Sequence, residues 1–258
     1  MSARASDARE FKLCGAWRRL TRVLAAAIVS VAIVKPGFGQ PPHTAHARMH
    51  AAAALVAQLR DMPLPRRPFA RGVSSSKAAS HPLPPLEVRR QRIYEQLHAL
   101  GPASVAALAG ALRDSDPRMR RDVAVALDVL GGGWWHFPDG SPRLDLRPAL
   151  PALLAALEDP DPSVRAWVAQ DLSDMGSAAA SAVAPLRNML NRPDAESRGS
   201  ACRALGSLGS EASAALPQLR RALGDPSPAV RAAAADAIAR IQRAEALGEP
   251  APDEKDAP

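Results

Sequence analysis

The chain has 258 residues, of which 47% are hydrophobic and only 3% are aromatic. This length allows one or two domains, and a core with so few large rings must be built from Ala, Leu and Val, which favours closely packed helices. Residues 86–243 carry only +1 of the net charge of +7, so the composition disfavours a nucleic-acid-binding surface in that region.

Residues 1–39 show the order of features that is typical of a secretory signal peptide. Arg18 and Arg19 precede a twelve-residue apolar run at 23–34, and small residues follow it as far as Gly39. Twelve apolar residues are fewer than the roughly 20 that a membrane-spanning helix needs. We therefore predict a periplasmic or secreted protein, and the alternative is an uncleaved N-terminal segment that anchors the chain to the membrane.

Residues 40–85 are rich in Pro, Ser and basic side chains. Such a composition buries too little apolar area to offset chain entropy, so this segment is predicted to be a tether. The Ala-rich stretch at 47–62 is the exception, because it predicts one short helix that ends before Pro63. The acidic residues 244–258 at the other end of the chain are predicted to form a disordered tail.

Residues 86–243 contain four segments that repeat one another around a common arginine. A Leu lies eight residues before this arginine, a small residue lies four after it, and large apolar residues lie seven and ten after it. The last three offsets share one face of an α-helix, so each segment predicts a helix, a tight turn and a second helix. One more second helix, around Arg90, precedes them. The anchor arginines are Arg120, Arg165, Arg198 and Arg231, and an aspartate lies six residues before three of them, at Asp114, Asp159 and Asp225.

This pattern resembles the short HEAT repeat first described in phycobilisome lyases, over about 60% of the chain. The resemblance implies an all-α fold, a short α-solenoid of antiparallel helix pairs with four HEAT-like repeats and an N-terminal half-repeat. It also implies that the turn aspartates and anchor arginines bond to neighbouring backbone or to each other between repeats. The third repeat has Arg192 in place of the aspartate and Ser197 in place of Val. Its turn is therefore predicted to be the loosest one, or a contact surface.

An insertion at about 131–147 interrupts the array, since 45 residues separate Arg120 from Arg165 where later anchors are 33 apart. It begins at Gly131, the predicted C-cap of the preceding helix. Its aromatic and polar residues would suit stacking on a flat ligand or filling a partner's groove. The alternative, which we favour, is that the aromatics cover the step between two repeats. The candidate partner-binding residues are Trp134, Trp135, His136, Phe137 and Asp139.

Three histidines, His43, His46 and His50, would share one face of a helix within reach of a metal ion. They have no acidic or cysteine support, so a chance cluster is favoured and no metal site is predicted. Cys202 occupies the small, buried repeat position, which favours inert packing over catalysis. Trp167 is predicted to be a surface contact or a partly covered residue on a helix flank. No nucleotide, nucleophile or zinc motif occurs, so the chain is assigned no catalytic residue and no cofactor.

These features predict a non-catalytic scaffold or adaptor of the cell envelope, which presents its concave helix face to another protein. Nucleic acid is not expected as a partner, and the apolar segment near the N-terminus is the candidate membrane tether. Two alternatives stay open. One is an enzyme on the same helix stack, similar to bilin lyases or alkylpurine DNA glycosylases. The other is a tethered metal-binding protein that uses His43, His46 and His50.

Overall fold

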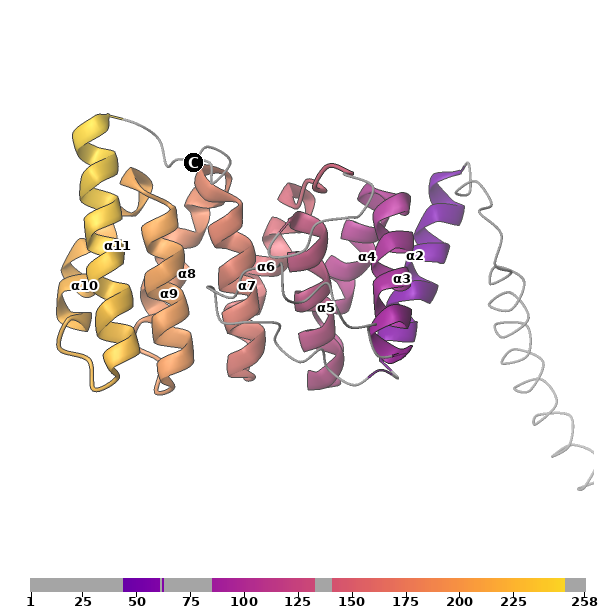
Figure 1. The fold of residues 1–258 in the computed structure, drawn as a ribbon, viewed down its shortest axis with the longest axis horizontal. Helices are drawn as coiled ribbons and strands as arrows, with labels where there is room; N and C mark the ends of the chain where they lie inside the picture. The colour runs from indigo at the N-terminus through magenta and orange to yellow at the C-terminus, as the bar shows by residue number, and fades with distance from the viewer. Residues whose placement is uncertain (1–43, 61, 63–84, 133–140, 249–258) are drawn as a thin grey trace, which may run out of the picture. The chain divides into compact units, whose positions relative to one another are not determined.

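The structure is a computed structural model that describes residues 44–60, 62, 85–132 and 141–248 (Figure 1). Over these residues the regular elements are all helices, which confirms the predicted all-α class. The predicted leader at 1–39 lies outside the described residues.

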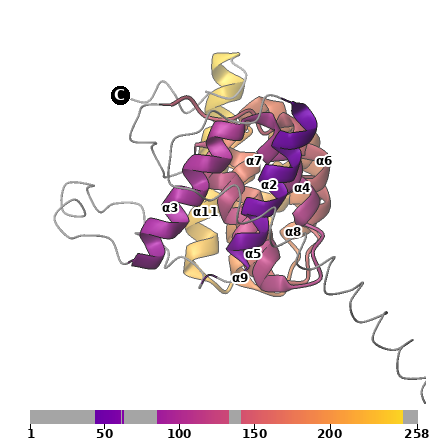
Figure 2. The same cartoon turned by 90° about the vertical axis from the view of Figure 1, so that its right-hand side faces the viewer.

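The helices of the described residues form two layers. Neighbouring second helices pack on one another along the stack, α5 on α7, α7 on α9 and α9 on α11. Figure 2 looks along the stack and shows α2, α4 and α6 on one side and α3 on the other. The first-helix layer consists of α2 (Ala45–Leu59), α4 (Pro102–Ala111), α6 (Leu150–Ala156), α8 (Val183–Met189) and α10 (Leu216–Ala222), and the second-helix layer of α3 (Pro85–Leu100), α5 (Pro117–Gly131), α7 (Pro162–Asp174), α9 (Ala195–Ser207) and α11 (Pro228–Leu247). Short 3₁₀ segments lead into three of the first helices: η2 (Arg147–Ala149), η3 (Gly176–Ala182) and η4 (Ser210–Ala215).

Helix α2 corrects the predicted tether at 40–85. The short helix expected at 47–62 forms, but Ala52, Val56 and Leu59 are buried in the core and the helix packs against α4 and α3. It therefore supplies the first helix of what the sequence suggested was a half-repeat, and the described residues hold five helix pairs. Burial of its apolar face is favourable because the neighbouring helix pair has an apolar surface that α2 covers.

Aspartate and proline residues set where the second helices begin. Asp116 caps α5 by accepting a hydrogen bond from the backbone N–H of Arg118, and Asp161 caps α7 in the same way. The proline that follows each cap occupies the first helical turn, where its missing N–H costs nothing. The predicted tight turns before the second helices are therefore present at these two repeats.

Two helix ends differ from the sequence expectation. The residue that ends α5 in the left-handed region is Gly132, with φ of 94°, and not the predicted Gly131, which is still helical. Helix α11 continues beyond the predicted boundary at 243, because Ala244 is buried against the core. Gly248, with φ of 62°, then ends it.

Gly206 lies at the closest approach of α9 to α11, and its replacement tests how tightly the repeats stack. A Cβ at this position would lie 2.8 Å from Cα of Ala237. We expect Gly206→Ala to lower the free energy of unfolding by about 1–3 kcal/mol, because backbone would have to move. The measurement is urea unfolding followed by circular dichroism.

Gly110 of α4 is the matched control. A Cβ there would meet nothing within 4 Å, so Gly110→Ala should raise the free energy of unfolding by roughly 0.5–1 kcal/mol through helix propensity alone. If Gly206→Ala were stabilising as well, the close approach of α9 and α11 would be contradicted.

Candidate interaction surface

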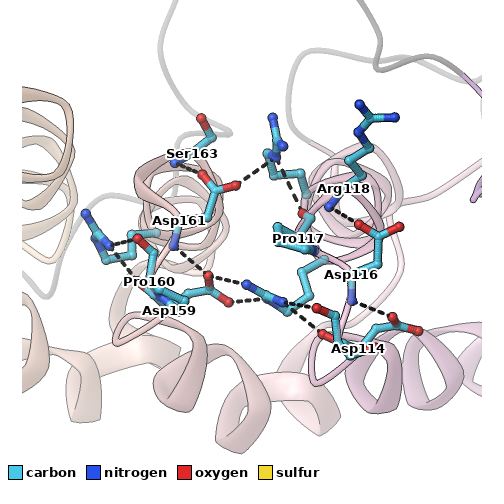
Figure 3. Close-up of polar contacts among 12 residues, drawn as sticks. Asp114, Asp116, Pro117, Arg118, Asp159, Pro160, Asp161 and Ser163 are labelled. Atoms are coloured by element: carbon cyan, nitrogen blue, oxygen red, sulfur yellow. Dashed lines mark hydrogen bonds and ion pairs between the residues drawn. The ribbon is translucent and has the colours of Figure 1, made fainter.

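A ladder of arginine–carboxylate contacts links successive repeats. Arg120 donates from Nε to Oδ2 of Asp159 at 2.6 Å and from Nη2 to Oδ1 at 3.0 Å, and both residues are buried. Its Nη1 donates to the backbone carbonyl oxygens of Asp114 at 2.9 Å and Ser115 at 3.3 Å. One guanidinium thus closes the turn of its own repeat and holds the turn of the next one (Figure 3).

Arg198 repeats this arrangement two repeats later. Its Nε and Nη2 donate to the two carboxylate oxygens of Asp225 at 2.7 and 2.9 Å, and its Nη1 donates to the carbonyls of Arg192 and Pro193. Hydrogen bonds from Arg198 hold the pKa of Asp225 below its ordinary value, so this contact is ionic at neutral pH.

The third repeat lacks the turn aspartate, and its neighbours compensate. Arg165 donates to Asp194 at 2.5 Å and to the hydroxyl of Ser197 at 2.8 Å, two residues that lie further along the chain than the usual aspartate. Arg192, which replaces that aspartate, forms an ion pair with Glu158 of the preceding repeat. The third turn is therefore held by Arg165, Arg192 and Arg198 and is not loose. Its use as a contact surface stays a prediction.

The ladder is different at the N-terminal helix pair. Arg90 pairs with Asp122 at 2.9 Å instead of reaching Asp114. Asp114 is paired with Arg60 at the end of α2, at 2.5 Å. Sequence reasoning missed this role of Arg60, although the letters LRD at 59–61 repeat those at 112–114 and would have marked the end of a first helix.

At the other end, the ladder stops at Arg231. This exposed residue closes its own turn through Nη1, which donates to the carbonyls of Asp225 at 2.8 Å and Pro226 at 3.0 Å. No carboxylate of the described residues pairs with it, although the equivalent arginines Arg120 and Arg198 each bind one.

The described part of the insertion packs on the end of α5. The backbone N–H of Leu144 donates to the carbonyl of Leu130 at 2.9 Å, and a ring nitrogen of His98 lies 2.7 Å from the carbonyl oxygen of Pro142. Leu146 is buried against Gly131, where an added Cβ would collide with Leu146 Cδ1. The returning half of the insertion therefore packs against α3 and the end of α5. The candidate binding residues Trp134, Trp135, His136, Phe137 and Asp139 lie outside the described residues.

Two carboxylates, Asp128 of α5 and Asp171 of α7, are buried where these helices meet, and they were not predicted from the sequence. Asp171 is only 1% exposed, and neither of its oxygens has a hydrogen-bond partner. Burial raises the pKa of Asp171 well above its ordinary value, and the nearby charges of Asp128 and Asp174 raise it further. The equivalent positions in the flanking repeats hold Ala126 and Ala204, so a polar residue at an alanine position was the available signal.

The outward face of the second-helix layer is open from α7 onward. The residues five after each anchor form a row across successive helices, here called the +5 row: Val125, Gln170, Arg203 and Asp236. Val125 is buried, Gln170 is half-buried, and Arg203 and Asp236 are exposed. Trp167, three residues before Gln170 on the same helix face, is half-buried against the core. Trp167 therefore agrees with the second of its two predicted roles, a partly covered residue on a helix flank.

The histidine and cysteine candidates show no metal or nucleophile site among the described residues. His46 and His50 are exposed, and their Nε2 atoms lie 2.9 Å apart, whereas His43 lies outside the described residues. No group of three or more His, Cys, Asp or Glu able to hold a metal ion occurs in the part of the chain that the structure describes. Cys202 is fully buried, and desolvation raises the pKa of its thiol to about 11.

The thiol of Cys202 is expected to be inert in the folded protein. At pH 8 a group with a pKa of about 11 is almost entirely protonated, and the thiolate is the reactive form. The chain has one other cysteine, Cys14, so the test uses a Cys14→Ser background. There, Ellman's reagent should label Cys202 at least about tenfold more slowly in buffer than in denaturant. Equal rates in both conditions would contradict the buried, inert position.

In the described part of the chain, no helix is both long and apolar enough to cross a membrane. A family model of HEAT repeats matches residues 140–196 and 183–249. No curated protein matches this chain.

Solved structures with similar helix arrangements include the CpcE–CpcF complex of phycocyanin lyase from Nostoc sp. PCC7120, with 26% identity, 72% of this chain and 73% of that chain covered, and a TM-score of 0.44. A designed armadillo repeat protein in complex with the peptide (KR)4 has 16% identity, 92% and 95% covered, and a TM-score of 0.49. An engineered protein has 20% identity, 78% and 85% covered, and a TM-score of 0.46. The repeat match over residues 140–249, together with the stacked helix pairs, shows that the chain carries HEAT-like repeats in an α-solenoid.

Proposed function

We propose that this protein is a non-catalytic interaction scaffold of the cell envelope, and that it binds another protein on the outward face of its second-helix layer. The observation that carries the proposal is the +5 row. The ladder holds successive helices in register, so Gln170, Arg203 and Asp236 are presented as a preformed row with different chemistry at each step. A preformed surface loses little conformational entropy on binding, which favours recognition of an extended partner.

The chemistry of this face suits a protein better than a nucleic acid. Arg203 and Asp236 have opposite charges on neighbouring helices, whereas a nucleic-acid surface needs a continuous basic stripe. Trp167 adds a large, half-buried aromatic side chain beside the row, and tryptophan is enriched among the residues that dominate protein–protein binding energy. Location in the envelope rests on the predicted leader at 1–39.

The test is photo-cross-linking of the full chain in cells of its source organism. A benzoylphenylalanine residue replaces Arg203 or Asp236 on the +5 row, and Ala184 on the exposed side of α8 serves as the control. We expect the two row positions, and not position 184, to cross-link one polypeptide in the envelope fraction, and Trp167→Ala to lower the yield. Equal yields at all three positions, or none at the row, would overturn the proposal.

A further inference from the structure

The C-terminal end of the described stack has the surface of an internal repeat that is not covered. Leu223, eight residues before the anchor, is 45% exposed. Its equivalents Leu112, Leu157 and Leu190 are 4%, 0% and 9% exposed, and a further helix pair follows each of them along the chain. Among the described residues no helix pair follows to cover Leu223, and because the residue type is the same at all four positions, the difference does not come from a polar cap.

The second helix of this repeat shows the same difference. Ala235, four residues after the anchor, is exposed, whereas the equivalent Ala124, Ala169 and Cys202 are at most 1% exposed. In the preceding step, the α9 face that includes Cys202 and Gly206 receives α11. The corresponding face of α11 is therefore shaped to receive one more helix at close range.

The charges at this end define what the covering element must carry. Arg231 uses only Nη1 within the described residues, so Nε and Nη2 are available to a carboxylate. Arg120 and Arg198 use those same two atoms to donate hydrogen bonds to the turn aspartate of the next pair. Exposed Arg220 and Arg221 on α10 add positive charge nearby. A partner turn with an Asp or Glu is electrostatically complementary to this end.

A second copy of this chain does not fit the requirement. In the third and fourth repeats, the residue directly before the anchor docks on the preceding pair, as Val230 does beside Gly199. The corresponding residue of the N-terminal pair is Arg89, an exposed arginine in place of a small or β-branched residue, so it does not suit a close approach to Ala235. Asp114, a turn aspartate of the first internal repeat, is paired with Arg60 and is not available to a second copy.

We propose that this end, formed by Leu223, Arg231, Ala235 and the exposed face of α11, docks a helix pair of a different polypeptide that extends the stack by one step. The partner places a carboxylate of its turn on Nε and Nη2 of Arg231 and a small or β-branched helix face on Ala235. This surface goes beyond the proposed function, because the +5 row and the end of the stack are different surfaces and each can be tested without the other.

The experiment uses the full chain in cells of its source organism, with benzoylphenylalanine at position 223 or, in a second strain, at 235. Cross-linked products are digested and the attached residue is identified by mass spectrometry. We expect attachment to another polypeptide, at a helix next to a turn with Asp or Glu. Arg231→Glu should lower the yield about tenfold, while Arg231→Lys retains part of it. Arg118→Glu, at an exposed position of α5 outside both proposed surfaces, is the matched charge control and should leave the yield at 223 unchanged.

Arg231 also closes its own turn, so a second variant separates docking from local structure. Ala235→Arg adds bulk on an exposed face without contacting the chain's own core, and it should block cross-linking from 223 while leaving the circular dichroism spectrum unchanged. The proposal is overturned if position 223 attaches to a second copy or to this chain's own residues 249–258. It is likewise overturned if no product forms, or if neither Arg231→Glu nor Ala235→Arg lowers the yield. Failure at 223 with cross-links retained at 203 rejects the end surface alone.

Discussion

Replacing Arg120 with alanine is expected to lower the free energy of unfolding by about 3 kcal/mol. The substitution leaves the buried carboxylate of Asp159 without its bidentate partner, and it removes the donor that closes the turn at Asp114 and Ser115. An unpaired buried charge costs much more than the pair gains, because the carboxylate keeps its desolvation penalty. Urea unfolding followed by circular dichroism measures the loss.

Arg231→Ala is the matched control for that prediction. It removes the same side chain from the same repeat position, but Arg231 is exposed and bonds only to backbone carbonyls of its own turn. Its effect should be at most a third of that of Arg120→Ala. The double variant Arg120→Met with Asp159→Leu should recover most of the lost stability, since it removes both charges together. Equal losses for the two single variants would show that the contact between repeats is not the source.

Replacing Asp171 with alanine is expected to have the opposite sign and to stabilise the protein at neutral pH, by about 1–3 kcal/mol. The carboxylate is buried without a hydrogen-bond partner, whereas alanine occupies the same position in flanking repeats. Its pKa in the folded protein is well above the ordinary value. The folded state therefore holds its proton more tightly than the unfolded chain does.

The pH dependence follows from that direction. Below the ordinary pKa of about 4 the group is protonated in both states, so wild type and Asp171→Ala should differ least. As the pH rises from there towards the raised pKa, wild type must keep a proton that the unfolded chain releases, and it loses stability relative to the variant. Unfolding free energies at several values between pH 4 and 8 measure this gap. Asp236→Ala removes an exposed aspartate of the +5 row and is the control, for which the unfolding free energy should stay equal to that of wild type. The assignment would be contradicted if the difference in unfolding free energy between Asp171→Ala and wild type became smaller as the pH rises.

The repeat units were predictable because the information is local. A Leu, a turn aspartate, an anchor arginine and apolar residues at helical offsets recur in each segment, and these spacings depend only on the geometry of one helix pair. The same spacing placed Cys202 at a buried small position, as the structure has it. Composition predicted a tether at 40–85 and did not indicate that α2 belongs to the stack. An Ala-rich helix with few large apolar residues has only a weak hydrophobic pattern of its own.

What the sequence by itself determined is the unit: helix, capped turn, second helix, and the arginine available to join one unit to the next. The tertiary structure alone decided which partners those arginines take, Asp194 and Ser197 for Arg165 and Asp122 for Arg90. It also decided that Asp171 faces a buried interface and that Leu223 does not. The physical reason is that burial and pairing are properties of the step between two units, and the repeated letters describe only the unit itself.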